Sequence, residues 1–261
     1  MQKPIPGFDT FDLLHNGYRH TVYRKASPGQ KGVLIIQELP GITPETVALA
    51  ERLHQDGFAV YLPHLFGEPN APADTLRNLG RLCINLEFRV LADKRRSPIT
   101  DWLRALCRRM QSDTGGPVGA IGMCLTGGFV LALMVDESVA APVMSQPSHI
   151  GGTKASLGMP DEVVCAAVDR CKKDDVPLLG LRFTRDIMCP PERFDRLSSL
   201  FGDHFRRIEI DGSLYRKHRI KPIAHSVLTL EFVDQPGHPT RDAYEQVVGF
   251  FNERLEHRAG T

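Results

Sequence analysis

The sequence predicts an α/β fold in which a mostly parallel central sheet carries helices on both faces. Short apolar runs typical of buried strands alternate with amphipathic helical patterns over about 200 residues. The runs are apolar throughout, as expected for strands covered on both faces. The chain has 261 residues, of which 42% are hydrophobic and 24% charged, an ordinary globular composition. We expect one domain spanning residues 1–261.

The expected strands share an apolar, often β-branched run bounded by polar or turn residues. In chain order they are 33–37, 58–62, 118–121, 139–144, 177–183 and 205–210. The stretch 18–24 instead alternates polar and apolar residues. We interpret it as an antiparallel strand at the edge of the sheet.

The expected helices show apolar residues at helical spacing, and some carry a start signal. The first begins at Thr43 as N-cap, with Pro44 at the first helical position. The others cover 74–92, 97–111, the residues after Cys124, a stretch from near 160, and 241–257. On the last helix, one face carries Tyr244, Val247, Val248, Phe251 and Leu255.

Composition and charge exclude several function classes. The formal net charge is +1, and the basic clusters are short, so we expect no nucleic-acid or membrane partner. The N-terminus shows no apolar signal segment. None of the six cysteines forms a C-x-x-C pair or has zinc-ligand spacing, which favours reduced thiols in a cytoplasmic protein without a metal or organic cofactor. The oligomeric state stays open.

The most informative stretch is 118–135, where an apolar run leads through Gly122 to Cys124 and then to a helical pattern. This order predicts a strand, a tight turn and a helix, with the cysteine at the apex. Backbone N–H groups at the start of such a helix favour a thiolate and a developing oxyanion. Two alternatives are a buried core cysteine and a membrane span of 18 uncharged residues. The four glycines of the run argue against a continuous spanning helix.

Polar residues that suit acyl transfer follow the predicted strands. Glu38 follows the run 33–37, Cys124 follows 118–121, and Asp186 follows 177–183. His225 lies in the polar loop after the last predicted strand. Parallel sheets place their sites at the carboxyl ends of strands, and the order Cys, Asp, His is that of α/β-hydrolase triads.

Each residue type has a role in such chemistry. Cys124 supplies the nucleophile, His225 moves its proton, and Asp186 orients the imidazole. The backbone N–H groups of Leu125 and Leu39 are the candidate oxyanion donors. Within the same loop region, His218 and His238 are alternatives to His225. His218 lies in a basic run and His238 between Gly237 and Pro239, and the choice of His225 over both depends mostly on the family resemblance given below.

Glu38 has two interpretations. A carboxylate at the end of a buried strand is costly without a partner, so it is either a salt-bridged residue or part of the site. In the second case, it holds the resting thiol of Cys124 until substrate displaces it.

Four segments together resemble the dienelactone hydrolase family, cysteine members of the α/β-hydrolase fold. They are Gln37–Ile42 (QELPGI), Ile121–Leu125 (IGMCL), Thr184–Asp186 (TRD) and Ala224–Ser226 (AHS). The resemblance spans about 30–255. It implies Cys124 as nucleophile, His225 as base, Asp186 as orienting acid and Glu38 as modulator of the thiol.

The chain departs from the family pattern at two positions. Thr126 stands where the family has glycine, and Thr229 stands where members that open dienelactone have a carboxylate-binding arginine. Arg81, Arg89 and Arg185 are weak substitutes for that cation.

The resemblance implies a carboxymethylenebutenolidase-like hydrolase of a small lactone or carboxylic ester, acting through an acyl-thioenzyme. Two alternatives stay open. One is a broad carboxylesterase or thioesterase. The other is a non-catalytic relative that binds a small ligand or senses redox state.

Overall fold

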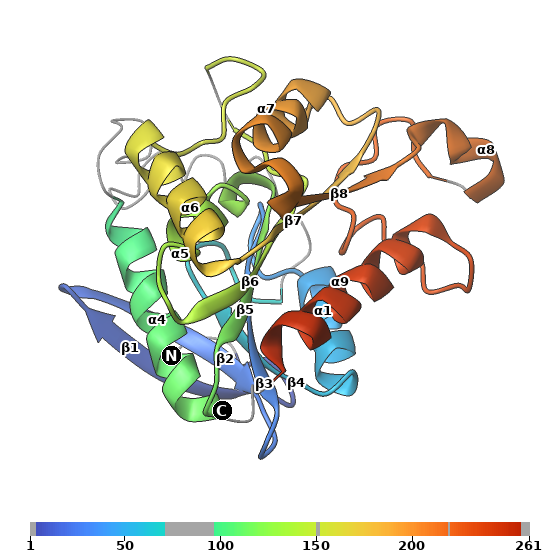
Figure 1. Ribbon diagram of the computed structural model, residues 1–261. Helices are drawn as coiled ribbons and strands as arrows, with labels where there is room; N and C mark the ends of the chain where they lie inside the picture. Colours follow the sequence, from blue (N-terminus) through green and yellow to red (C-terminus); the bar gives the residue numbers. More distant parts are fainter. Residues whose placement is uncertain (1–3, 71–96, 150–151, 219, 257–261) are drawn as a thin grey trace.

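A computed structural model describes residues 4–70, 97–149, 152–218 and 220–256. Eight strands form one sheet in the order β1-β2-β4-β3-β5-β6-β7-β8 (Figure 1). Their bounds are β1 (Asp9–His15), β2 (Tyr18–Lys25), β3 (Lys31–Ile36), β4 (Phe58–Pro63), β5 (Val118–Met123), β6 (Val139–Ser145), β7 (Leu178–Phe183) and β8 (Phe205–Ile210). The six strands from β3 to β8 pair in parallel, which confirms the predicted sheet.

The prediction of an edge strand at 18–24 is wrong in one respect. The segment forms antiparallel β2, but it pairs with β1 on one side and β4 on the other, so β1 is the edge. The sequence DTFDLLH of β1 lacks an apolar run because most of the strand is exposed or half-buried. A better signal was the Asn16-Gly17 pair between the strands. Both residues have positive φ, as a two-residue hairpin turn requires.

Helices cover both faces of the sheet (Figure 1). One face carries α1 (Pro44–Gln55) and α9 (Pro239–Leu255), which share a core with Val33 and Ile35 of β3. The other face carries α4, α5, α6 and α7, and the α4 side contacts Leu34 and Ile36 of the same strand. The remaining bounds are α4 (Pro98–Thr114), α5 (Phe129–Leu133), α6 (Asp161–Asp174), α7 (Pro191–Phe201) and α8 (Tyr215–His218), with short 3₁₀ turns η1 (Cys124–Thr126), η2 (Gly202–His204) and η3 (Gly212–Leu214).

Most helix predictions are confirmed. Thr43 caps α1, since its hydroxyl accepts a hydrogen bond from the Thr46 N–H at 3.3 Å. The predicted helix 74–92 lies outside the described residues. No described helix has the length and apolar character needed to cross a bilayer.

The sheet has a switch point between β3 and β5. From β3 the chain crosses to β4 on one side and later returns to β5 on the other. Ile36 of β3 pairs with Gly122 of β5, so the residues that follow the two strands emerge side by side. In open α/β sheets, such a point is where ligands bind. Glu38 and Cys124 both lie there.

Candidate active site

Cys124 occupies a sharp turn at the end of β5. Its φ is +52°, a left-handed conformation that costs a non-glycine residue about 1–3 kcal/mol. A Cβ added at Gly122 would lie 2.5 Å from the Thr126 carbonyl oxygen, so the turn requires glycine there. The chain then forms η1 before α5 begins at Phe129, so the helix predicted directly after Cys124 starts later and is short. The turn places Cys124 on the wall of a cavity.

The hydroxyl of Thr126 lies at hydrogen-bonding distance from both this turn and the neighbouring strand. This buried hydroxyl accepts a hydrogen bond from the Met123 N–H at 3.1 Å. The hydroxyl proton can go to the Met123 carbonyl at 2.9 Å in the same turn, or to the carbonyls of Gln37 at 3.2 Å and Ile36 at 3.3 Å at the end of β3. The departure from the family's glycine therefore has a structural account: the hydroxyl links the turn at Cys124 to the end of β3.

Asp186 and His225 form a hydrogen-bonded pair. Oδ2 of Asp186 lies 2.6 Å from Nδ1 of His225, and both side chains are largely buried. The other oxygen, Oδ1, accepts from the N–H groups of Met188 at 2.9 Å and Cys189 at 3.2 Å. With both oxygens held, the carboxylate fixes the orientation of the imidazole.

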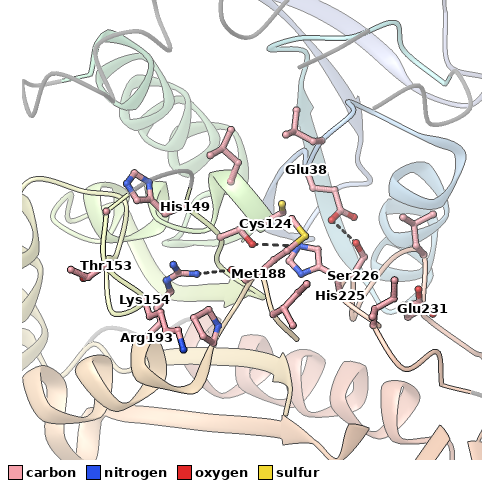
Figure 2. Close-up of a pocket in the computed structure, with 18 residues that line it drawn as sticks. Glu38, Cys124, His149, Thr153, Lys154, Met188, Arg193, His225, Ser226 and Glu231 are labelled. Carbon is pink, nitrogen blue, oxygen red and sulfur yellow. Dashed lines mark hydrogen bonds between the residues drawn. The ribbon is translucent and has the colours of Figure 1, made fainter. Parts of the chain in front are cut away.

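Cys124 and His225 both line the same cavity, as Figure 2 shows, and the thiol of Cys124 is one of the groups that raise the pKa of His225. Nε2 of His225 lies 3.4 Å from the hydroxyl of Ser148, whose backbone N–H binds the Cys124 carbonyl at 2.8 Å. The structure thus brings together three of the predicted residues, Asp186, His225 and Cys124.

The charge on His225 is strongly favoured. Burial opposes its protonation, but the hydrogen bond with Asp186, the charge of Asp186 and the interactions with Cys124 together raise the pKa of His225 to about 10. These interactions favour the protonated imidazole. An imidazolium in that position stabilises a thiolate on Cys124.

Glu38 is buried and held by hydroxyl and amide groups. Oε2 accepts from the Ser226 hydroxyl at 2.8 Å (Figure 2). Oε2 also accepts from the Gln146 amide at 3.2 Å, and Oε1 accepts from the Thr229 hydroxyl. Burial raises the pKa of Glu38, while these donors and the charge of His225 oppose the shift. These bonds hold the carboxylate beside the candidate triad. None of them involves the thiol of Cys124.

We expect Glu38→Gln to speed alkylation of Cys124 by iodoacetamide about threefold to tenfold in the pH range in which the Glu38 carboxyl is ionised, because it removes a buried negative charge that repels the thiolate. The measurement is the pH profile of the alkylation rate, made in a Cys165→Ala background because Cys165 is an exposed thiol. If wild type and Glu38→Gln give the same pH profile of the alkylation rate, the predicted role of Glu38 is wrong.

Gln146 and Ser148 are site residues that the sequence analysis missed. They directly follow β6, so inspecting the end of that strand as closely as the others would have found them. Gln146 has a φ of +35°, and its side-chain oxygen accepts from Val227 N–H at 3.3 Å, which ties β6 to the loop carrying His225.

The cavity beside Cys124 has a volume of about 620 Å³. Leu39 and Leu125 line it, as expected of residues that supply oxyanion donors. Arg185 is exposed, lies against Gly212 and does not line this cavity. Arg81 and Arg89 lie outside the described residues.

Comparison with known proteins places the chain in a family. The sequence model of the dienelactone hydrolase family matches residues 19–166, more than half of the chain, including Glu38 and Cys124. No curated protein matches the chain by sequence.

Solved structures share the fold. A candidate dienelactone hydrolase from Klebsiella pneumoniae superposes with a TM-score of 0.63 at 18% identity, covering 94% of this chain and 98% of that one. A dienelactone hydrolase from Anabaena variabilis gives 0.55 at 17% identity, covering 95% and 99%. A cold-adapted esterase from an Arctic intertidal metagenomic library gives 0.62 at 12% identity, covering 97% of both chains. The sheet order, the turn at Cys124 and the family match together show that the chain is an α/β hydrolase and belongs to the dienelactone hydrolase family.

Proposed function

We propose that this protein hydrolyses a small carboxylic ester or lactone through a Cys124–His225–Asp186 triad. The observation that carries the proposal is the hydrogen bond between Asp186 and His225 at the switch point of the sheet, next to a cavity of about 620 Å³ that both His225 and Cys124 line. Cys124 lies within the range matched by the family, whereas Asp186 and His225 lie beyond it and are assigned from geometry. We also propose that residues 1–261 form one domain.

Acylation begins from the Cys124 thiolate and the His225 imidazolium. The thiolate attacks the carbonyl carbon of the ester, and the carbonyl oxygen becomes an oxyanion. The backbone N–H groups of Leu125 and Leu39 are the proposed donors to it. When the intermediate collapses, the C–O bond to the alcohol breaks, and the leaving alkoxide takes the proton from Nε2 of His225.

Deacylation follows from the change of charge on Cys124. In the thioester the sulfur is neutral, so two of the influences that raise the pKa of His225, the hydrogen bond and the charge of Cys124, are lost. The neutral imidazole can then accept a proton from water. The hydroxide formed attacks the thioester, the C–S bond breaks, and the carboxylic acid leaves. The thiolate and the imidazolium are restored.

A broad carboxylesterase or thioesterase is the second candidate, and Thr229 favours it. This residue stands where family members that open dienelactone have an arginine, and its hydroxyl binds Glu38. The site therefore lacks the family's cation at that position. The acyl-thioenzyme mechanism is the same for a lactone, an oxygen ester or a thioester.

Capture of the acyl-enzyme tests the proposal. We expect p-nitrophenyl acetate to give a burst of p-nitrophenolate, and acid-quenched protein to carry one acetyl group on the peptide that contains Cys124, identified by mass spectrometry. An acetyl group on Ser148 instead would assign the nucleophile to that residue. Absence of both burst and acetylation, with dienelactone also stable, would favour a binding or redox-sensing role.

A further inference from the structure

Exposed apolar side chains gather at the mouth of the candidate active site. Among the described residues, five large hydrophobic side chains are exposed: Leu14 (57%), Ile187 (81%), Met188 (50%), Ile223 (74%) and Leu230 (48%). All but Leu14 line the cavity that contains Cys124. We refer to Ile187, Met188, Ile223 and Leu230 as the apolar rim. Because a contiguous exposed apolar patch marks a binding surface, the rim points to an apolar ligand group.

The loops that carry the candidate triad also carry this rim. Ile187 and Met188 directly follow Asp186, while Ile223 and Leu230 flank His225 in the chain. Leu39 and Leu125 continue the apolar lining toward Cys124 and are half-buried. A substrate whose apolar group lies on the rim can therefore place its carbonyl carbon at the sulfur of Cys124.

The cations of the cavity wall are already engaged. Arg193 is buried, and its guanidinium donates to the carbonyl oxygens of Pro147 at 2.6 Å, Ser156 at 2.6 Å and Met188 at 2.9 Å. Lys154 projects largely into solvent and pairs with Glu192 at 3.4 Å. Neither of these two cations stands at position 229, where family members that open dienelactone have a carboxylate-binding arginine.

The remaining charges near Cys124 disfavour an anionic substrate. Glu38 and Glu231 both line the cavity, and Glu231 pairs with Lys221 at 3.1 Å, which leaves Glu38 as the acidic lining residue without an ion pair among the described residues. His149 lies in the same wall, and burial and the charge of Arg193 lower its pKa, so it is neutral at neutral pH. The charge of the imidazolium of His225 is matched by Asp186. Among the described residues of the wall, the exposed cation that could meet a substrate carboxylate is Lys154, which pairs with Glu192.

We propose that the substrate is a neutral ester with an apolar acyl group, held by the apolar rim, rather than an anionic lactone. The inference rests on the proposed function, since it concerns the same site. Added methylene groups would lie on Ile187, Met188, Ile223 and Leu230, which become covered when substrate binds. Burial of that surface in the transition state raises kcat/KM.

A matched series of p-nitrophenyl esters tests the inference. From acetate to hexanoate we expect kcat/KM to rise about tenfold or more. One methylene in a fully enclosed apolar pocket changes kcat/KM by about that factor. Because this rim is partly open, we expect four methylenes together to give an effect of that size. Mono-p-nitrophenyl glutarate and p-nitrophenyl pentanoate form the second comparison, since they have equal acyl chain length and differ by a carboxylate. We expect the neutral pentanoate to react at least tenfold faster.

The double variant Ile187→Ser with Ile223→Ser should lower the hexanoate-to-acetate ratio of kcat/KM severalfold. Both side chains are exposed, so the fold does not depend on them. Leu14→Ser is the control, because Leu14 is also exposed but lies on β1 at the far edge of the sheet. It should leave the ratio at the wild-type value.

The outcomes separate the inference from the proposed function. Cys124-dependent turnover with a flat chain-length profile, or with preference for the glutarate ester, would overturn the inference and keep the hydrolase. A rising profile that the double variant does not change would show that the rim does not hold the acyl group. Absence of Cys124-dependent turnover of every ester would overturn both.

Discussion

Cys124→Ala is expected to lower kcat/KM for p-nitrophenyl acetate by roughly 10⁴-fold or more, since loss of a nucleophile leaves only oxyanion stabilisation and binding. The alanine keeps the Cβ and removes only the sulfur, so the turn at φ +52° and the hydrogen bonds of Thr126 are retained. The measurement is steady-state hydrolysis followed by p-nitrophenolate absorbance, with circular dichroism to verify the fold.

The other described cysteines provide the control. Burial raises the pKa of Cys171 to about 11 and that of Cys189 to about 12, and also raises the pKa of Cys107, so these thiols are poor nucleophiles. Cys165 is exposed on α6. Cys165→Ala should therefore retain wild-type turnover. Comparable rates for Cys124→Ala and wild type would eliminate Cys124 as the nucleophile.

The sequence predicts the parallel part of the fold well, because buried strands must be apolar on both faces. β3 illustrates this: its successive side chains Leu34, Ile35 and Ile36 enter two different cores. This criterion does not identify β1, because an edge strand that faces solvent does not need apolar side chains. Its pairing depends on the turn at Asn16-Gly17, a feature of backbone conformation rather than of hydrophobicity.

The site was predictable where chemistry restricts the residue type at a strand end. Cys124, Asp186 and Glu38 follow their strands and meet at one edge of the sheet, because parallel strands end on the same side. The partners of Glu38 were not predictable. Gln146 comes from the loop after β6, Ser226 and Thr229 come from the loop before α9, and their hydroxyl and amide groups are common on any surface.

The sequence did not predict the apolar rim, for a similar reason. Isolated residues such as Ile187 and Ile223 in loops carry no periodic signal, and an exposed isoleucine is ordinary by itself. Their meaning comes from convergence on one cavity, which only the folded loops create.

Asp186→Asn is expected to lower kcat by about 10³–10⁴-fold. The amide oxygen can still accept from the N–H groups of Met188 and Cys189, so the loop stays in place. The amide nitrogen, however, would face Nδ1 of His225 as a donor, where wild type has a carboxylate oxygen at 2.6 Å. The imidazole then needs the proton on Nε2 to avoid two donors meeting, and neutral His225 cannot accept a proton there.

The same substitution should shift the titration of His225 in a defined direction. Burial opposes the charge, and Asp186 provides the first of the interactions that raise the pKa of His225 to about 10, so its loss moves the pKa down. Wild type should keep the imidazolium through the neutral range and lose it near pH 10, whereas Asp186→Asn should lose it at lower pH. The ring resonances of His225, followed by NMR as pH rises, measure this. Asp195→Asn, an exposed acid of α7 paired with Arg207, is the control and should leave the titration in place. An unchanged titration in Asp186→Asn, together with near wild-type kcat, would rule out Asp186 as the residue that orients His225.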